Sequence, residues 1–159
     1  IAIEPSNIQF EKLKKNRKCK LFNDAISDEV KEVEFTEVIE GLTQMSGINN
    51  NFFEKNKNII TNNRASKTKS FNIKTITFDQ VISKNTDIDY LSIDIEGGEM
   101  ALLNSIKFND YHIKVISIEN NIPEAQNFKN FFDDKNFKYF DRVGQDEIFY
   151  NSKFFNFNK

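Results

Sequence analysis

The sequence predicts an α/β fold with a mostly parallel sheet. Strand-like apolar runs alternate along the chain with helix-like segments, which is the order expected of such a fold. Two of these runs are Ile88–Asp94 and Ile113–Glu119. They lack the apolar–polar alternation of a strand with one solvent-exposed face, as is typical of strands buried on both faces. The length of 159 residues favours one domain spanning residues 1–159.

The first part of the chain contains two short apolar strands around a helix, followed by a longer alternating strand. Ser6 is a good N-cap, and Ile8, Phe10 and Leu13 follow it at helical spacing. The predicted strands are Ile1–Ile3, Cys19–Phe22 and Val30–Val38.

Residues 39–70 lose this periodicity and are rich in asparagine and lysine. A long segment without periodicity inside a compact domain is usually functional or disordered. We therefore interpret residues 39–70 as a mobile insertion or loop, with 47–70 the least ordered internal stretch.

Periodicity returns at Phe71. The predicted strands of the second part are Phe71–Thr77, Ile88–Asp94, Ile113–Glu119, Lys138–Phe140 and Glu147–Tyr150, the last two around Gly144. The predicted helices are Phe78–Ser83, Glu99–Ile106 and one from Pro123 and Glu124 to about Phe132.

Composition excludes some classes of function. Twenty-two basic and 24 acidic residues give a net charge of −2, so a general nucleic-acid binder is not expected. No apolar stretch approaches the length of a membrane span. The single cysteine, Cys19, excludes an internal disulfide and fits a reducing compartment, so we expect a cytoplasmic protein.

Acidic and amide side chains gather where the predicted parallel strands end. The strand ends carry Glu4, Asn23 with Asp24, Asp94 with Glu96, and Glu119 with Asn120. The carboxyl ends of parallel strands share one edge of the sheet, where ligands bind. Helix capping explains Asp24 or Asn120 alone as well as a site does. The whole set indicates a site, because gathered carboxylates repel one another unless a ligand or donor compensates.

The densest point is the segment from Asp94 to Glu99. Gly97 and Gly98 allow the backbone to approach a ligand closely at the start of a helix. The alternative is a sharp strand-to-helix turn that merely requires glycine.

At this segment the sequence resembles a known family. The stretch IDYLSIDIEGGEMALLNSI resembles the signature of the FkbM family of S-adenosylmethionine-dependent methyltransferases, in which a strand runs into a D-V-E-G-A-E-type turn and a helix. Further segments resemble that family in the same order: IAIEPSNIQFEKLKKN, LFNDAISD, IKTITFDQVI and VGQDEIFY.

The resemblance implies a Rossmann-like class I methyltransferase fold with helices on both faces of the sheet. It also implies S-adenosylmethionine as cofactor and a hydroxyl of a sugar, glycan or small molecule as methyl acceptor. The family's first strand and its glycine loop are expected upstream of Ile1, so the chain is interpreted as N-terminally truncated.

Roles follow for the acids at the sheet edge. Glu4 can accept the ribose hydroxyls, as the acid of dinucleotide folds does. The resemblance places Asn23, Asp24 and Ala25 beside the adenine, although Asp24 can equally be a cap. Asp94 lies near both cofactor and acceptor. With Glu96 or Glu119 it can orient the acceptor hydroxyl or take its proton, unless it only fixes the turn.

Other tempting residues have plainer interpretations. His112 precedes its strand, at the end opposite Glu119, and is not expected to be catalytic. Cys19 is interpreted as a core thiol. In the phenylalanine-rich C-terminal part, core packing is expected for Phe131, Phe132, Phe137, Phe140 and Phe149. Phe154, Phe155 and Phe157 are expected to cover an apolar patch or a neighbouring subunit.

Two alternative functions stay open. Asp94-x-Glu96 after an apolar strand imitates the D-x-D element of a metal-dependent glycosyltransferase. The missing glycine loop also allows a non-catalytic fragment or partner module.

Overall fold

A computed structural model describes residues 1–49, 51–123 and 126–157. The chain divides into two compact units. Unit 1 comprises residues 1–81 with 95–98, and unit 2 comprises residues 82–94 with 99–159. Each unit forms its own hydrogen-bonded sheets, so each is described by itself.

Unit 1 contains short parallel strand pairs and one long antiparallel pair. Its elements are β1 (Ala2–Ile3), α1 (Asn7–Asn16), β2 (Leu21–Phe22), β3 (Ala25–Ile26), β4 (Glu32–Glu40), η1 (Thr43–Met45), β5 (Gly47–Ile48), α2 (Asn51–Asn62), β6 (Lys67–Ile76) and α3 (Phe78–Val81). Strands β1 and β2 form a two-stranded parallel sheet. A second sheet has the order β3-β6-β4-β5, in which only β3 and β6 are parallel.

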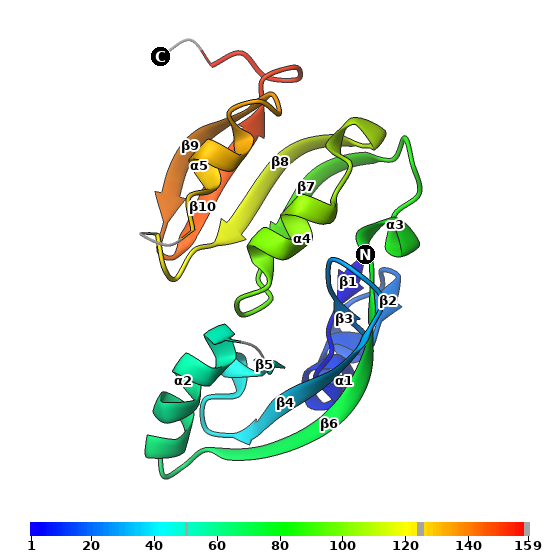
Figure 1. The fold of residues 1–159 in the computed structure, drawn as a ribbon. Helices are drawn as coiled ribbons and strands as arrows, with labels where there is room; N and C mark the ends of the chain where they lie inside the picture. Colours follow the sequence, from blue (N-terminus) through cyan, green and yellow to red (C-terminus); the bar gives the residue numbers. More distant parts are fainter. Residues whose placement is uncertain (50, 124–125, 158–159) are drawn as a thin grey trace. The chain divides into compact units, whose positions relative to one another are not determined.

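Strands β4 and β6 form the long arm of unit 1 (Figure 1). Phe35 and Phe71 lie opposite each other across this pair, and their ring centroids are 5.6 Å apart. The helix predicted after Ser6 is confirmed as α1, and the Ser6 side chain caps it by accepting a hydrogen bond from the Gln9 amide.

The interpretation of 39–70 as a loop without regular structure is wrong for much of this segment. It contains β5, α2 and the start of β6. Residues 67–70 of β6 are all exposed, so no apolar alternation announces the strand. It forms because its backbone pairs with β4, with Lys69 opposite Glu37. Mobility of the segment stays a prediction.

Unit 2 is a four-stranded sheet in the order β7-β8-β10-β9. Its elements are β7 (Asp87–Ile93), α4 (Glu99–Ser105), η2 (Phe108–Asp110), β8 (His112–Glu119), α5 (Phe128–Phe132), β9 (Phe137–Val143) and β10 (Asp146–Asn151). Helices α4 and α5 lie over the same face of this sheet (Figure 1). Helix α5 begins later than predicted, with Asn127 as its N-cap; Glu124, in the predicted start, lies outside the described residues.

The α/β class is confirmed, but the prediction of one mostly parallel sheet is wrong. Strands β7 and β8 are parallel, whereas β10 is antiparallel to both β8 and β9. The turn at Gly144, with φ +63°, joins β9 directly to β10, and so short a connection allows only an antiparallel pair. The N-terminal strands β1 and β2 pair with each other in a sheet that is separate from the sheet of β7 and β8.

Aromatic rings fill the covered side of unit 2. The ring of Phe132, 1% exposed, lies 4.7 Å from Phe149 and 5.1 Å from Phe137, measured between centroids. The expectation of core packing is therefore confirmed for these rings. It is wrong for Phe140, which is 41% exposed on the edge strand β9, and Phe157 packs against it.

Two further observations bear on the chemistry. Cys19 is exposed, contrary to the prediction of a core thiol, because it lies in the bend before the short strand β2. Among the described residues, no helix combines the length and the apolar character that crossing a membrane requires.

Candidate functional site

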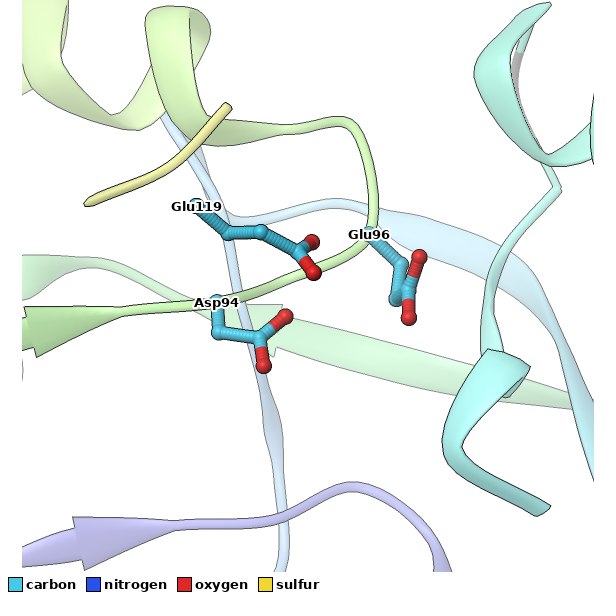
Figure 2. Close-up of side chains that lie close together, drawn as sticks. All are labelled: Asp94, Glu96 and Glu119. Carbon is cyan, nitrogen blue, oxygen red and sulfur yellow. The ribbon is translucent and has the colours of Figure 1, made fainter. Parts of the chain in front are cut away.

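Asp94 and Glu119 come together because their strands are parallel neighbours. The register pairs Ile93 of β7 with Ile118 of β8, so the next residues, Asp94 and Glu119, leave the sheet at the same level. Figure 2 shows their carboxyl groups turned toward each other, and a side-chain hydrogen bond joins them. The adjacency expected from the strand ends is therefore found.

Strand β10 adds a third carboxyl to this edge. Asp146 begins β10 and pairs with Glu119 across the antiparallel ladder. Asp94, Glu119 and Asp146 therefore form a row across three neighbouring strands. Asp146 was missed by sequence reasoning, although an acid directly after the Gly144 turn could have indicated it.

The turn after β7 carries the glycines that the sequence singled out. Glu96 has φ +54° and Gly97 φ +108°, so the chain passes through the left-handed region at both positions. A Cβ on Gly98 would lie only 3.0 Å from Cδ1 of Ile95. The glycines thus satisfy a sharp turn, and holding a non-glycine residue at positive φ is a form of strain that concentrates at functional sites.

Glu96 extends from this turn (Figure 2). One carboxylate oxygen from each of Asp94, Glu96 and Glu119 can be chosen so that all lie within 4.8 Å of one another. Acidic groups are often this close without an ion. The direct hydrogen bond between Asp94 and Glu119 is explained by a shared proton.

A shared proton requires raised pKa values. The pKa of Glu119 is raised to about 7. The largest cause is partial desolvation, followed by the charge of Asp94, the hydrogen bond with Asp94 and the charge of Glu99. Partial desolvation also raises the pKa of Asp94, with a contribution from the charge of Asp146, although its hydrogen bond with Glu119 opposes the shift. A carboxyl with a pKa near 7 can both hold and accept a proton at neutral pH.

Two other residues act on Glu119 that the sequence did not assign. The side chain of Asn121 forms a hydrogen bond with Glu119, which works against the rise in its pKa. Glu99, 2% exposed in the first turn of α4, acts through its negative charge. Glu99 belongs to the quoted turn motif, which was the available signal for it.

Hydroxyl groups lie next to the carboxyl row on the same face of the sheet. Ser92 and Ser117 precede Asp94 and Glu119 by two residues and therefore point the same way. The Tyr90 hydroxyl lies 2.6 Å from Ser117 Oγ, which donates to Ser92 Oγ at 3.3 Å. The end of this face next to the carboxyl row therefore carries several hydroxyl groups, beside the apolar Ile148.

Four of the five residues predicted to hold the cofactor, Glu4, Asn23, Asp24 and Ala25, belong to unit 1, whereas Asp94 belongs to unit 2. Glu4 follows β1, and its Oε1 accepts a hydrogen bond from the Ser6 amide at 2.8 Å, which orients the carboxylate. Asn23 donates from Nδ2 to the Glu4 carbonyl at 2.9 Å and so ties the ends of β1 and β2 together. Asp24 is half-buried, and Ala25 is 2% exposed as the first residue of β3.

A buried carboxylate that sequence reasoning missed holds the segment after Glu4. Glu37 of β4 is 4% exposed, and its Oε1 accepts hydrogen bonds from the Ser6 hydroxyl at 2.7 Å and the Ile8 amide at 3.0 Å. It therefore fixes the start of α1, directly after the Glu4-Pro5 step. Glu37 lies two residues after Phe35 and thus in phase with the apolar face of β4, which was the available signal for it.

His112 lies where the sequence predicted. It begins β8, at the end opposite Glu119, and its Nδ1 is 2.8 Å from Oδ1 of the exposed Asp87. An eight-residue strand separates it from Glu119, so it does not belong to the carboxyl row.

Comparison with known proteins gives one match. The family model described as the methyltransferase FkbM domain matches residues 1–143. Neither the search of curated proteins nor the search of solved structures found a match. The matched region contains Glu4, Asp94 and Glu119, and it covers nearly the whole chain. The chain therefore belongs to the FkbM methyltransferase domain family.

Proposed function

We propose that this chain is an S-adenosylmethionine-dependent O-methyltransferase in which the Asp94–Glu119 pair accepts the proton of a hydroxyl acceptor. The single observation that carries this proposal is the hydrogen-bonded carboxyl pair, in which Glu119 has a pKa of about 7, in a chain of a methyltransferase family. Such a pair can accept a proton near neutral pH without a histidine.

The residues at the ends of β1 and β2 offer hydrogen-bonding partners for S-adenosylmethionine. A carboxylate at the end of a parallel strand can accept hydrogen bonds from both ribose hydroxyls, and Glu4 offers one that the Ser6 amide holds in place. Asn23, Asp24, Ala25 and Asp94 complete the proposed cofactor residues. The amide nitrogen of Asn23 is engaged by backbone carbonyls, which suits it to shaping the site. Glu4 and Asn23 therefore fit the ribose part of the proposed cofactor.

When bound, S-adenosylmethionine supplies an electrophilic methyl group on a positively charged sulfur. The carboxyl pair orients the acceptor hydroxyl and takes its proton while the oxygen lone pair forms the bond to the methyl carbon. Glu4 would hold the cofactor, whose sulfur would take the electrons of the broken carbon–sulfur bond and leave as a neutral thioether. Glu96 is a further candidate to orient the acceptor.

The proposed acceptor is a sugar, glycan or small molecule. The carboxyl row and the neighbouring hydroxyls of Ser92, Ser117 and Tyr90 offer hydrogen-bond partners for a polyol. A cytoplasmic location is proposed from the single cysteine, which fits a reducing compartment.

The test combines calorimetry and methyl transfer from labelled S-adenosylmethionine to a panel of monosaccharides, oligosaccharides and small polyols. Glu119→Gln should reduce transfer about 10²–10⁴-fold, the usual contribution of a general base. Its affinity for S-adenosylhomocysteine should stay near that of the unaltered chain. Glu4→Gln should weaken that affinity roughly tenfold, about 1.4 kcal/mol.

His112→Gln is the matched control, because it alters a titratable side chain at the other end of β8. Transfer should rise with pH up to about 7 and then level off, since the deprotonated pair is the active form. Absence of S-adenosylhomocysteine binding would contradict the proposal. Binding of a nucleotide-sugar that depends on a divalent cation would instead support the glycosyltransferase alternative.

A further inference from the structure

A second buried carboxylate lies next to the carboxyl row, on the opposite face of the sheet. Glu147 follows Asp146 on β10 and pairs with Ile118, so its side chain points to the covered face and is 7% exposed. Burying a carboxylate is costly unless charged and hydrogen-bonding partners compensate. The residues that contact the Glu147 carboxylate therefore indicate its role in the structure.

The first partner is Asn120, which directly follows Glu119. Asn120 is fully buried, and its Nδ2 donates to Oε1 of Glu147 at 3.1 Å and to the Gln126 carbonyl at 3.0 Å. Its backbone amide donates to the Gln145 carbonyl at 2.9 Å. Asn120 is thus held through both its side chain and its backbone.

The second partner is Arg142 of β9. Its Nη2 donates to the Asn120 carbonyl at 3.0 Å, and its Nε donates to the Gly144 carbonyl at 3.0 Å. Its Nη1 lies 3.8 Å from Oε1 of Glu147. Arg142 therefore joins the β9–β10 turn to the backbone that leaves β8.

This cluster is not arranged for stability alone. In the described part of the chain, the buried oxygens Oδ1 of Asn120 and Oε2 of Glu147 have no hydrogen-bond donor. Each such oxygen costs free energy, and apolar side chains of the same volume would avoid the cost. Departures of this kind from stable packing concentrate where a fold serves a site.

The geometry points to Glu147 and Arg142 as positioning residues that hold residues 119–121, through Asn120, so that the Glu119 carboxyl faces Asp94. The segment carries both Glu119 and Asn121, whose side chains are hydrogen-bonded to each other. A change in the direction of Asn120 would displace both neighbours. This inference rests on the proposed function for its catalytic consequence, but its structural consequence can be measured independently.

The decisive variant is the double substitution Arg142→Met and Glu147→Leu, which removes both charged residues that contact Asn120. Because no uncompensated charge remains, the double variant should unfold at the same denaturant concentration as the unaltered chain or a higher one. Glu147→Leu alone is the companion variant. Lys138→Met is the matched control, since Lys138 is an exposed cation on the same strand, β9.

We expect the double variant to exchange the Asn120 and Asn121 amides about tenfold faster. It should also shift the ¹³C resonance of the Glu119 carboxyl carbon at a fixed pH. Its kcat for methyl transfer should fall about tenfold while the KM for S-adenosylmethionine stays within about twofold. The Lys138→Met control should change none of these quantities.

A double variant that keeps the original amide exchange, ¹³C resonance and kcat would overturn the inference. A folded double variant whose losses equal those of Lys138→Met would do the same. If the unaltered chain transfers no methyl group, the proposed function fails. The exchange rates and the Glu119 resonance still decide whether Glu147 and Arg142 position the segment.

Discussion

Helices α1 and α5 are attached to their units in opposite ways. Helix α1, described over its whole length, buries no residue, and polar groups hold its N-terminus: Ser6 caps it and Glu37 accepts the Ile8 amide. Helix α5 is half as long but buries Phe128 and Phe132 completely or nearly so. Oriented hydrogen bonds therefore hold α1 in unit 1, whereas the burial of apolar rings holds α5 in unit 2.

The comparison teaches where each unit is sensitive. A helix held by a few polar contacts depends on single donors and acceptors, each worth roughly 0.5–3 kcal/mol. A helix held by packed rings depends on shape and volume, and losing a large buried side chain costs more.

Phe132→Ala should cause the largest loss. The ring lies between Phe137 and Phe149 and is 1% exposed, so its removal leaves a cavity and should lower the free energy of unfolding by about 3–5 kcal/mol. The matched control is Phe10→Ala on α1, where the ring is only half-buried and a smaller loss is expected. Urea denaturation measures both, and equal losses would remove the contrast.

Glu37→Ala should cause the next largest loss. It leaves the Ser6 hydroxyl and the Ile8 amide without their acceptor, at a cost of about 1.5–3 kcal/mol. Glu40→Ala on the same strand removes only an exposed ion pair with Lys67, worth less than about 1 kcal/mol. Amide exchange at Ile8 and Gln9 should rise with the first variant alone.

The stability of unit 2 should depend on pH through Glu119. Its pKa is 4.5 in an ordinary environment and about 7 in the folded chain, so the folded state holds a proton that the unfolded state releases. Stability should therefore fall as pH rises from about 4.5 to about 7, and Glu119→Gln should reduce this dependence. Urea midpoints across that range provide the measurement. A rise in stability with pH that Glu119→Gln removes would have the wrong sign for a raised pKa.

Cys19→Ser should have the smallest effect. The thiol is exposed between α1 and β2, so the change in stability should stay within about 0.5 kcal/mol. The unaltered thiol should react with a thiol reagent as fast in the folded chain as in urea. Slow labelling would show that this end of α1 is more closely packed than its exposure indicates.

Elements with a local signal could be predicted from the sequence. The Ser6 cap, the apolar runs of β7 and β8, and the glycines after β7 identify the helix, the strands and the turn. Because consecutive parallel strands end at one edge, the predicted strands also placed Asp94 and Glu119 close together. The motif around Asp94 also indicated the family, which the match to residues 1–143 confirms.

Strand pairing and the burial of polar groups depend on contacts between residues far apart in the chain. The exposed start of β6 forms because β4 supplies backbone partners, and β10 runs antiparallel because the Gly144 turn is short. Glu37 and Glu147 look like other acids in the sequence, yet each is buried against donors far along the chain. Burial of a polar group depends on distant partners, so the local pattern alone does not decide it.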